Sequence, residues 1–149
     1  MIVVDTSAIA AILFQEPDAA VFETVLGRAE RCAMSAVTRV ELSCVVEGRK
    51  GEAGRQALED LLDLLRVEVV PVDLAQVHLA ISAFRSFGKG RHPAGLNIGD
   101  CFSYALSKSL GEPLLFKGAD FMATDVTRLP LLGRRFHFTA EPRPAAAGQ

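Results

Sequence analysis

The chain has 149 residues, of which 50% are hydrophobic and 23% charged, so it is long enough to fold as one domain with a buried core. Its formal net charge of −2 excludes a protein that is basic all over, but not one with local basic patches beside an acidic site. Three cysteines, with no CxxC pair and no His/Cys cluster, argue against a zinc site and a disulfide framework and favour buried, reduced thiols.

The opening segment reads as a buried strand. Residues 1–4 are apolar at every position rather than alternating, which is typical of a central strand in a parallel sheet. No basic segment precedes them, and the longest uncharged apolar stretch, Thr6 to Phe14, is too short to cross a bilayer. We therefore expect a cytoplasmic protein with no signal peptide and no membrane partner.

Further strands and helices alternate along the chain. Strands are expected at 32–34, 67–72 and 113–116, with a last short one near 136–138. Helices are expected over 6–14, from Pro17 to about Arg28, after Ser35 as an N-cap, through Leu58 to Leu65, from Asp73 to about Phe87, and over 97–110. Two glycine-containing segments, 48–54 and 88–95, are expected to be a polar turn and a basic loop.

This alternation predicts the α/β fold class, with a parallel central sheet that carries helices on both faces. Because no repeat or linker interrupts the chain, we expect one domain over residues 1–139. The segment 140–149 is rich in Pro and Ala and has nothing to bury, so we expect a disordered tail there.

Two acids follow predicted strands. Asp5 comes directly after the first strand, and open α/β sheets bind ligands at the carboxyl ends of their strands. Asp5 could equally serve only as the N-cap of the next helix. Asp120 follows the fourth strand and a glycine turn, close to Asp125, and spacing alone does not rank these two acids. We predict that Asp120 is a site residue and that Asp125 and Thr124 support it by contacts from outside the ligand set.

Two more acids lie on predicted helices. Glu41 falls on an apolar helical stripe formed by Val37, Val40, Cys44 and Val45, so we expect its carboxylate to point inward. A buried carboxylate needs a partner, which a metal ion or an ion pair with Arg39 would supply. Asp100 lies in the first turn of its helix, where an acid often only complements the helix dipole. The preceding Gly99 would also let a ligand approach closely.

These acids are expected to converge at one edge of the sheet. Asp5, Glu41, Asp100 and Asp120 would repel one another unless a cation lay between them, and a set of oxygen ligands suits Mg²⁺ or Mn²⁺ rather than zinc. Such an ion can activate water and stabilise the charge that develops on a phosphodiester. Thr6 and Ser7 follow Asp5 and are candidates for hydrogen bonds that support the site.

The loop over 88–95 and the helix before it carry the basic candidates. Arg85, Lys89, Arg91 and His92 would contact RNA phosphates if this loop flanks the acidic crevice. The alternative is a solvated, glycine-rich connector with no binding role.

Four segments occur in a specific order. They are Val4 to Ala8, Ser35 to Leu42, Gly88 to Phe102, and the stretch from Leu114 to Asp125. In this order they resemble the PIN-domain ribonucleases and, within them, the VapC-type toxins of bacterial toxin–antitoxin pairs. The resemblance covers Met1 to Leu129.

The resemblance implies a three-layer α/β/α sandwich and an endoribonuclease site in which Asp5, Glu41, Asp100 and Asp120 bind Mg²⁺ or Mn²⁺ and carry catalysis. It also implies a homodimer, a small antitoxin that silences it in a hetero-oligomer, and structured RNA such as tRNA as the substrate. The turn before Asp120 reads Gly-Ala where relatives often have a second acid, so one or two ions remain possible.

Other functions are compatible with parts of the sequence. A module on the same fold that binds RNA or a protein partner without cleaving is the main alternative. A phosphatase that works through an aspartyl-phosphate is disfavoured, because it needs a second aspartate two residues after the first and the chain has Ser7 there.

Overall fold

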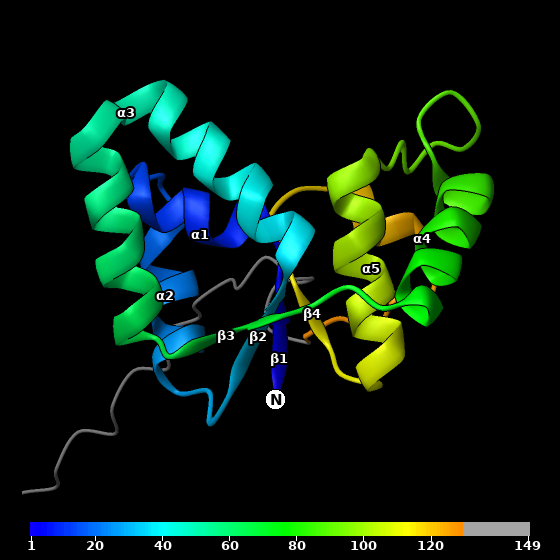
Figure 1. Ribbon diagram of the computed structural model, residues 1–149, viewed down its shortest axis with the longest axis horizontal. Coiled ribbons are helices and arrows are strands. Elements are labelled where there is room, and N and C mark those ends of the chain that lie inside the picture. The colour runs from blue at the N-terminus through cyan, green and yellow to red at the C-terminus, as the bar shows by residue number, and fades with distance from the viewer. Residues whose placement is uncertain (130–149) are drawn as a thin grey trace, which may run out of the picture.

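A four-stranded parallel sheet forms the centre of the protein (Figure 1), and the computed structural model describes residues 1–129. The spatial order of the strands is β3 (Val67–Val70), β2 (Cys32–Ser35), β1 (Ile2–Val4) and β4 (Leu114–Leu115). In the register of the sheet, Ile2 lies opposite Cys32 and Val3 opposite Leu114. The interior position of β1 explains why its segment is apolar at every residue, and the predicted first strand is confirmed.

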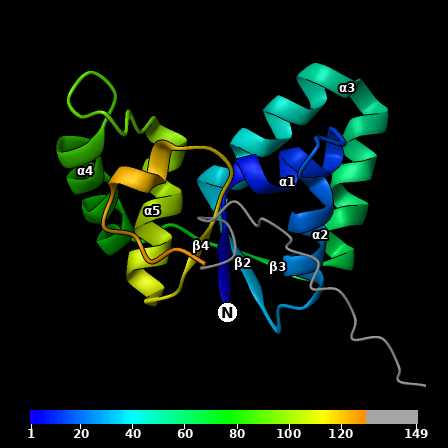
Figure 2. The same ribbon diagram turned by 180° about the vertical axis from the view of Figure 1, so that it is seen from behind.

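Two layers of helices cover the sheet, one on each face (Figures 1 and 2). One layer holds α1 (Thr6–Leu13), α2 (Ala19–Gly27) and α3 (Ala36–Leu64), and the other holds α4 (Leu74–Phe87) and α5 (Ile98–Leu110). The side chains of successive strand residues point to opposite faces of the sheet. Val4 therefore packs against the first layer of helices and Val3 against the second. The predicted three-layer α/β/α sandwich is confirmed.

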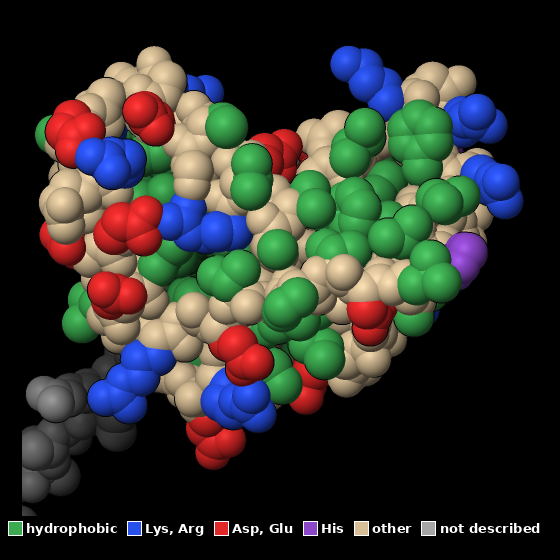
Figure 3. Space-filling view, viewed as in Figure 1, with side chains coloured by type: hydrophobic (Ala, Val, Ile, Leu, Met, Phe, Trp, Pro, Cys, Tyr) green, Lys and Arg blue, Asp and Glu red, His purple; other side chains and the backbone are tan. Residues whose placement is uncertain are grey.

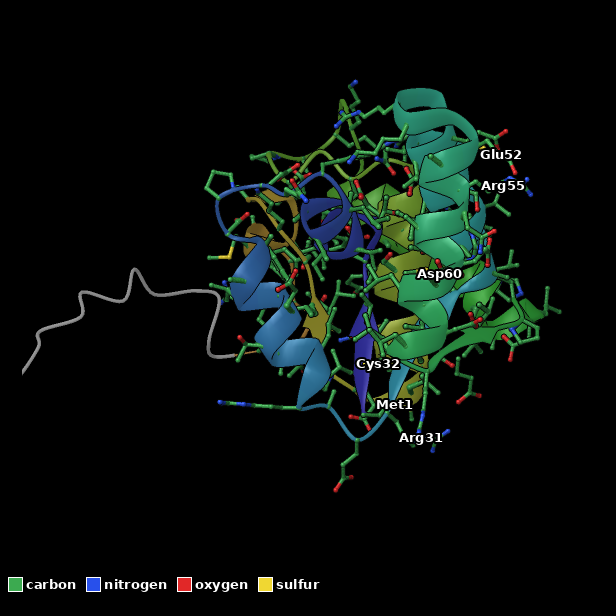
Figure 4. The ribbon with its side chains drawn as sticks, turned by 90° about the vertical axis from the view of Figure 1, so that its left-hand side faces the viewer. Met1, Arg31, Cys32, Glu52, Arg55 and Asp60 are labelled. Atoms are coloured by element: carbon green, nitrogen blue, oxygen red, sulfur yellow. The ribbon has the colours of Figure 1, made fainter. Side chains whose placement is uncertain are left out.

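One predicted break in the chain is shorter than expected. The polar turn expected over residues 48–54 is a bend within α3, which spans 29 residues and consists of two helical segments. The helix kinks at Gly51 alone, whose φ of 59° and ψ of −148° suit a residue without a Cβ. Glu52 and Arg55 form an ion pair just beyond the kink and lie near the bend of α3 (Figure 4). The flanking residues are good helix formers, so one residue suffices for the change of direction.

The buried face of the first half of α3 differs from the predicted stripe by one position. Thr38, Leu42 and Val46 are buried, whereas Val40 is 63% exposed. A polar residue can take the inward position because the Thr38 hydroxyl lies 3.0 Å from that of Ser103 on α5. The same one-residue shift turns Cys44 outward, so the prediction of a buried thiol is wrong there, while Cys32 and Cys101 are buried as predicted.

Some predictions lie outside the described residues. They concern the strand near 136–138, the domain end at 139 and the tail over 140–149. Within residues 1–129, no helix is both long enough and apolar enough to span a membrane.

The direction of the strands decides at which edge of the sheet the predicted site residues lie. Met1, Arg31 and Cys32 lie together at the amino-terminal edge of the sheet (Figure 4). Because all strands are parallel, their carboxyl ends lie at the opposite edge, where α1 and α3 begin directly after β1 and β2. Ligands of open α/β sheets bind at this carboxyl edge.

Candidate functional site

A cavity of about 220 Å³ opens at the carboxyl edge of the sheet. Figure 3 shows acidic side chains at the base of the hollow between the two helical layers. The residues that line the cavity are Asp5, Thr6, Ser7, Glu41, Asn97, Asp100, Lys117, Asp120 and Phe121. The four acids predicted to converge therefore face one cavity, although they come from four separate parts of the chain.

Asp5 is held by three hydrogen bonds and is only 3% exposed. Its Oδ2 accepts the Ser7 backbone N–H at 3.0 Å and the Ser7 hydroxyl at 2.6 Å, and its Oδ1 accepts the hydroxyl of Ser103 at 2.7 Å. Asp5 is thus the N-cap of α1, as the alternative interpretation held, and also lines the cavity. These donors fix the orientation of the carboxylate.

A pair of buried hydroxyls links Asp5 to the helices that carry Glu41 and Asp100. Thr38 lies three residues before Glu41 on α3, and Ser103 lies three residues after Asp100 on α5. Their hydroxyl oxygens are 3.0 Å apart, and Ser103 donates to Asp5. Sequence reasoning missed both residues. The only signal was their spacing of one helical turn from an acid, which becomes informative once the acids are known to converge.

Glu41 receives its hydrogen bond from within the site. The Thr6 hydroxyl donates to its Oε2 at 3.0 Å. Arg39, the alternative partner, forms its ion pair with Glu59 instead. Burial raises the pKa of Glu41, the hydrogen bond from Thr6 opposes that rise, and the nearby charge of Asp5 adds to it. A nearby cation would relieve this cost of keeping Glu41 charged.

The backbone of α5 touches the Glu41 carboxylate at Gly99. A Cβ at this position would lie 2.2 Å from the Oε2 of Glu41 and 2.7 Å from its Oε1. Atoms do not approach so closely, so the position requires glycine as long as the carboxylate stays in place. Gly99, singled out from the sequence for close approach of a ligand, is in fact approached by a carboxylate of the site.

Asp100 also combines a structural role with a place in the cavity. It forms a capping box with Asn97, in which each side chain accepts the other residue's backbone N–H at 2.8 Å. Burial raises the pKa of Asp100 to about 7, against the opposing effect of the Asn97 hydrogen bond. The charges of Asp5, Asp120 and Glu41 add to the rise, as expected for acids that face the same cavity.

The structure distinguishes Asp120 from Asp125, because only Asp120 lines the cavity. Asp120 begins the short 3₁₀ helix η1 (Asp120–Ala123) and lines the cavity. Asp125 instead accepts the Tyr104 hydroxyl at 2.6 Å and pairs with Lys108 at 3.0 Å, and these partners lower its pKa. Thr124 donates to the Phe121 carbonyl at 2.8 Å. The supporting contacts predicted for Thr124 and Asp125 are therefore absent from the described residues, whereas those predicted for Thr6 and Ser7 are present.

The donor set of the cavity fits a hard divalent cation. Carboxylate and hydroxyl oxygens surround it, and no cysteine or histidine lines it in the described part of the chain. Burial is the main cause of the raised pKa values of Asp100 and Glu41 and the charges of neighbouring acids add to it, so a nearby cation would favour the charged carboxylates. As the side chains stand, however, no three acids among residues 1–129 converge into a complete metal-binding group.

The predicted basic residues lie elsewhere. Arg85 and Arg91 line a separate, apolar pocket between α4 and α5, and the Arg91 guanidinium lies 5.4 Å from the centre of the Phe84 ring. His92 accepts the Ala94 backbone N–H at its Nδ1, and Lys89 is exposed. None of the four lines the acidic cavity in the part of the chain described. The cation that does line it, Lys117, was missed by sequence reasoning.

The raised pKa of Asp100 predicts a pH-dependent stability for the metal-free protein. With a folded pKa of about 7 against an ordinary value of 3.8, Asp100 favours folding most at low pH, and this contribution disappears as the pH rises through 7. The loss amounts to about 1.4 kcal/mol for each pKa unit between the two states. Urea unfolding in EDTA between pH 5 and pH 8 should show the free energy of unfolding falling as the pH rises.

The variant Asp100→Asn supplies the control, because its side-chain oxygen can still accept the Asn97 N–H. We expect its stability to change less with pH than that of the unmodified protein over the same range. An equal slope in both proteins would assign the dependence to other groups.

Comparisons with known proteins agree with the fold. Residues 2–126 match the PIN domain family. VapC ribonuclease Mb0640 of Mycobacterium bovis is 46% identical over 129 residues, which cover 87% of this chain and 98% of that protein. The crystal structure of Mycobacterium tuberculosis VapC20, described as a Sarcin-Ricin loop cleaving toxin, superimposes with a TM-score of 0.71 at 17% identity, over 87% of this chain and 98% of that chain. A toxin–antitoxin complex from Klebsiella pneumoniae superimposes with a TM-score of 0.63 at 17% identity, over 87% and 98%.

Proposed function

The chain belongs to the PIN-domain family, and on that premise we propose that it is a VapC-type toxin, a Mg²⁺- or Mn²⁺-dependent endoribonuclease that hydrolyses phosphodiester bonds in structured RNA such as tRNA. The observation that carries the proposal is the single cavity onto which Asp5, Glu41, Asp100 and Asp120 all face. Oxygen donors at the carboxyl edge of a parallel sheet suit phosphodiester hydrolysis assisted by a metal ion.

In this proposal the four acids hold the ion and act as the catalytic residues. A bound Mg²⁺ or Mn²⁺ would supply Lewis acidity and lower the pKa of bound water. The protein's part is orientation. Ser7 and Ser103 fix both oxygens of Asp5, and Thr6 fixes one oxygen of Glu41. Hydrogen bonds of this kind from outside the ligand set typically change metal affinity about 10- to 100-fold.

Protein partners are the second part of the proposal. We propose a cytoplasmic homodimer that also forms a hetero-oligomer with a small cognate antitoxin. Hydrophobic side chains gather over α4 and α5 on one face of the molecule (Figure 3), where the exposed Ile81 and Ile98 line one apolar pocket. An apolar surface of this kind supports a protein interface. Light scattering of the chain alone and with its neighbouring gene product tests both assemblies.

A role for Arg85, Lys89, Arg91 and His92 in RNA binding stays a prediction. Arg91 and Arg85 border the apolar pocket between α4 and α5 rather than the acidic cavity, so any phosphate they contact would lie away from the cleaved bond. Substituting them should weaken RNA binding and leave metal binding unchanged.

Expression in a bacterial host tests the proposal against a non-cleaving binding module. A toxin arrests growth, and coexpression of its antitoxin restores growth. Sequencing of RNA 5′ ends after brief induction, with Asp5→Asn beside the unmodified protein, identifies the cleaved RNA. Growth arrest that persists in Asp5→Asn, with no new 5′ ends in either strain, would favour the binding module.

Asp120 and Asp125 offer a matched pair of substitutions. We expect Asp120→Asn to lower the rate of RNA cleavage by about tenfold or more, because it removes a charge from the cavity. Asp125→Asn should leave cleavage within about twofold of the unmodified rate, since Asp125 pairs with Tyr104 and Lys108. Single-turnover cleavage of the identified RNA at saturating Mg²⁺ measures both. The reverse ranking would exchange the roles assigned to these two acids.

A further inference from the structure

Two hydroxyl groups lie buried behind the acidic cavity. Thr38 on α3 and Ser103 on α5 are both fully buried, and their hydroxyl oxygens are 3.0 Å apart. Neither is among the described residues that line the cavity. A fully buried hydroxyl has to find its hydrogen-bond partners within the protein, since water does not reach it. The fold therefore determines what these two groups donate to and accept from.

The direction of the hydrogen bond between the two hydroxyls follows from Asp5. In its charged, metal-binding form Asp5 can only accept, so the bond of 2.7 Å from Ser103 to the Oδ1 of Asp5 uses the single hydrogen of Ser103. Ser103 then has no hydrogen left for Thr38, and Thr38 is the donor of the pair. The two hydroxyls form a directed chain from Thr38 through Ser103 to Asp5. Successive hydrogen bonds of this kind polarise and strengthen one another.

The same chain connects the elements that carry three of the four acids. Thr38 lies one helical turn before Glu41 on α3, and Ser103 lies one helical turn after Asp100 on α5. Asp5, at the other end of the chain, lies between β1 and α1. The hydrogen bond between the two hydroxyls therefore joins α3 to α5 close to the cavity, and Ser103 joins both helices to Asp5.

We propose that Thr38 is a positioning residue of the metal site, which acts on Asp5 through Ser103. Because Thr38 donates to Ser103, the hydrogen of Ser103 is directed to Asp5 and the carboxylate keeps one orientation at the cavity. Without the Thr38 hydroxyl, the Ser103 oxygen is a buried acceptor that has lost its donor, which weakens its hold on Asp5. The inference rests on the proposed function in one respect, namely that a divalent cation binds at the acidic cavity.

The alternative is that the hydroxyl pair only fastens α3 to α5. Both interpretations predict a lower melting temperature when Thr38 loses its hydroxyl, so stability does not separate them. Metal affinity does, because a bond that only fastens two helices leaves the orientation of Asp5 unchanged. Groups that hydrogen-bond a metal ligand typically change metal affinity about 10- to 100-fold, and Thr38 lies one hydrogen bond further away, so its effect should be smaller.

The experiment measures Mn²⁺ binding by the full chain without RNA, from the electron paramagnetic resonance signal of the free ion. Ser103→Ala should weaken binding about tenfold or more. Thr38→Val keeps the branched shape without the hydroxyl and should weaken binding about three- to tenfold. Thr38→Ser restores the hydroxyl and should bring the affinity back to within about twofold. When Ser103 is already replaced by alanine, Thr38→Val should weaken binding no further, because the chain is already broken.

Ser107 supplies the matched control on the same helix. It lies one turn beyond Ser103 on α5, is buried, and donates its hydroxyl to the backbone carbonyl of Glu112 at 2.6 Å. It does not belong to the described set of residues around the cavity. Ser107→Ala should therefore lower the melting temperature by removing a buried hydrogen bond, and it should leave Mn²⁺ affinity unchanged.

Thermal unfolding without metal identifies any variant that fails to fold, and Thr38→Ala then takes the place of Thr38→Val. Unchanged Mn²⁺ affinity in the Thr38 variant, an equal loss in Ser107→Ala, or a further loss when Thr38→Val is added to Ser103→Ala would overturn the inference. Failure of both Thr38→Val and Thr38→Ala to fold would also overturn it, because the hydroxyl would then serve the fold.

The unmodified protein separates this inference from the proposed function. If it binds Mn²⁺ but cleaves no RNA, the ribonuclease function fails, and the Thr38 variants still decide the inference. If it binds no Mn²⁺, both fail. If it binds Mn²⁺ and cleaves RNA while Thr38→Val keeps full affinity, only the role of Thr38 is wrong.

Discussion

Replacing Asp5 with asparagine is expected to abolish RNA cleavage and leave the protein folded. The change removes one charge from the cavity, and loss of one group that stabilises charge in a transition state commonly costs about 10²- to 10³-fold in rate. The rate of cleavage of the identified RNA, measured with excess Mg²⁺, provides the test. Thermal shift on addition of Mn²⁺, which should shrink in the variant, provides a readout independent of catalysis.

The fold should survive because asparagine can satisfy the same neighbours. Its oxygen can accept the two hydrogen bonds from Ser7, and its amide can donate to the Ser103 hydroxyl, which can turn its own hydrogen toward Thr38. Each buried polar group then keeps a partner. A large loss of stability would contradict this description of the network around Asp5.

Asp73 provides the matched control for the alternative role of Asp5 as a helix cap. It is the N-cap of α4 and accepts the Gln76 backbone N–H at 2.8 Å, but it does not line the cavity. Asp73→Asn should therefore leave cleavage unchanged. Cleavage at the unmodified rate in Asp5→Asn would remove Asp5 from the proposed site, whatever its role as a cap.

A single methyl group at Gly99 is expected to disable the site without unfolding the protein. The new Cβ would overlap the Glu41 carboxylate, which lies at the end of a flexible side chain and can swing away. Alanine is also a better helix former than glycine by about 0.5–1 kcal/mol. We expect Gly99→Ala to weaken Mn²⁺ binding and slow cleavage by about tenfold or more, with the metal-free melting temperature changed by only about a few degrees.

A double-mutant comparison shows whether the effect acts through Glu41. In a Glu41→Ala background the carboxylate is gone, so Gly99→Ala should cause no further loss of Mn²⁺ affinity. Gly48→Ala, at a helical glycine in α3 with no atom within 4 Å of the added Cβ, should leave metal binding unchanged. Full Mn²⁺ affinity in Gly99→Ala would show that Glu41 does not need its observed position.

The acids of the site were predictable from the sequence because local patterns mark them. Asp5 ends a strand that is apolar at every residue, and Asp100 follows Asn97 at the spacing of a capping box. Parallel strands then bring such positions to one edge of a sheet, whatever the distance between them along the chain. Local pattern and general topology thus predicted that these residues lie at one edge, but for Asp5 and Asp100 they left a role as a helix cap equally open.

The remaining features depend on contacts between distant residues, which leave no local pattern. The partners of Lys117 lie about a hundred positions away in the turn around Glu16, so nothing near Lys117 marks it. The inward position of Thr38 depends on Ser103, on another helix. The bend in α3 was predicted at the right place but too long, because a single glycine with a positive φ changes the direction of the helix.

The strand order also governs when the protein can become active during synthesis. β1 is made first, yet it lies between β2 and β4 and pairs with the last described strand of the chain. Asp120, which completes the four acids, comes after that strand. A ribosome must therefore translate most of the message before all residues that line the cavity are present. Until then, the growing chain lacks one of the four acids that we propose to carry out RNA cleavage.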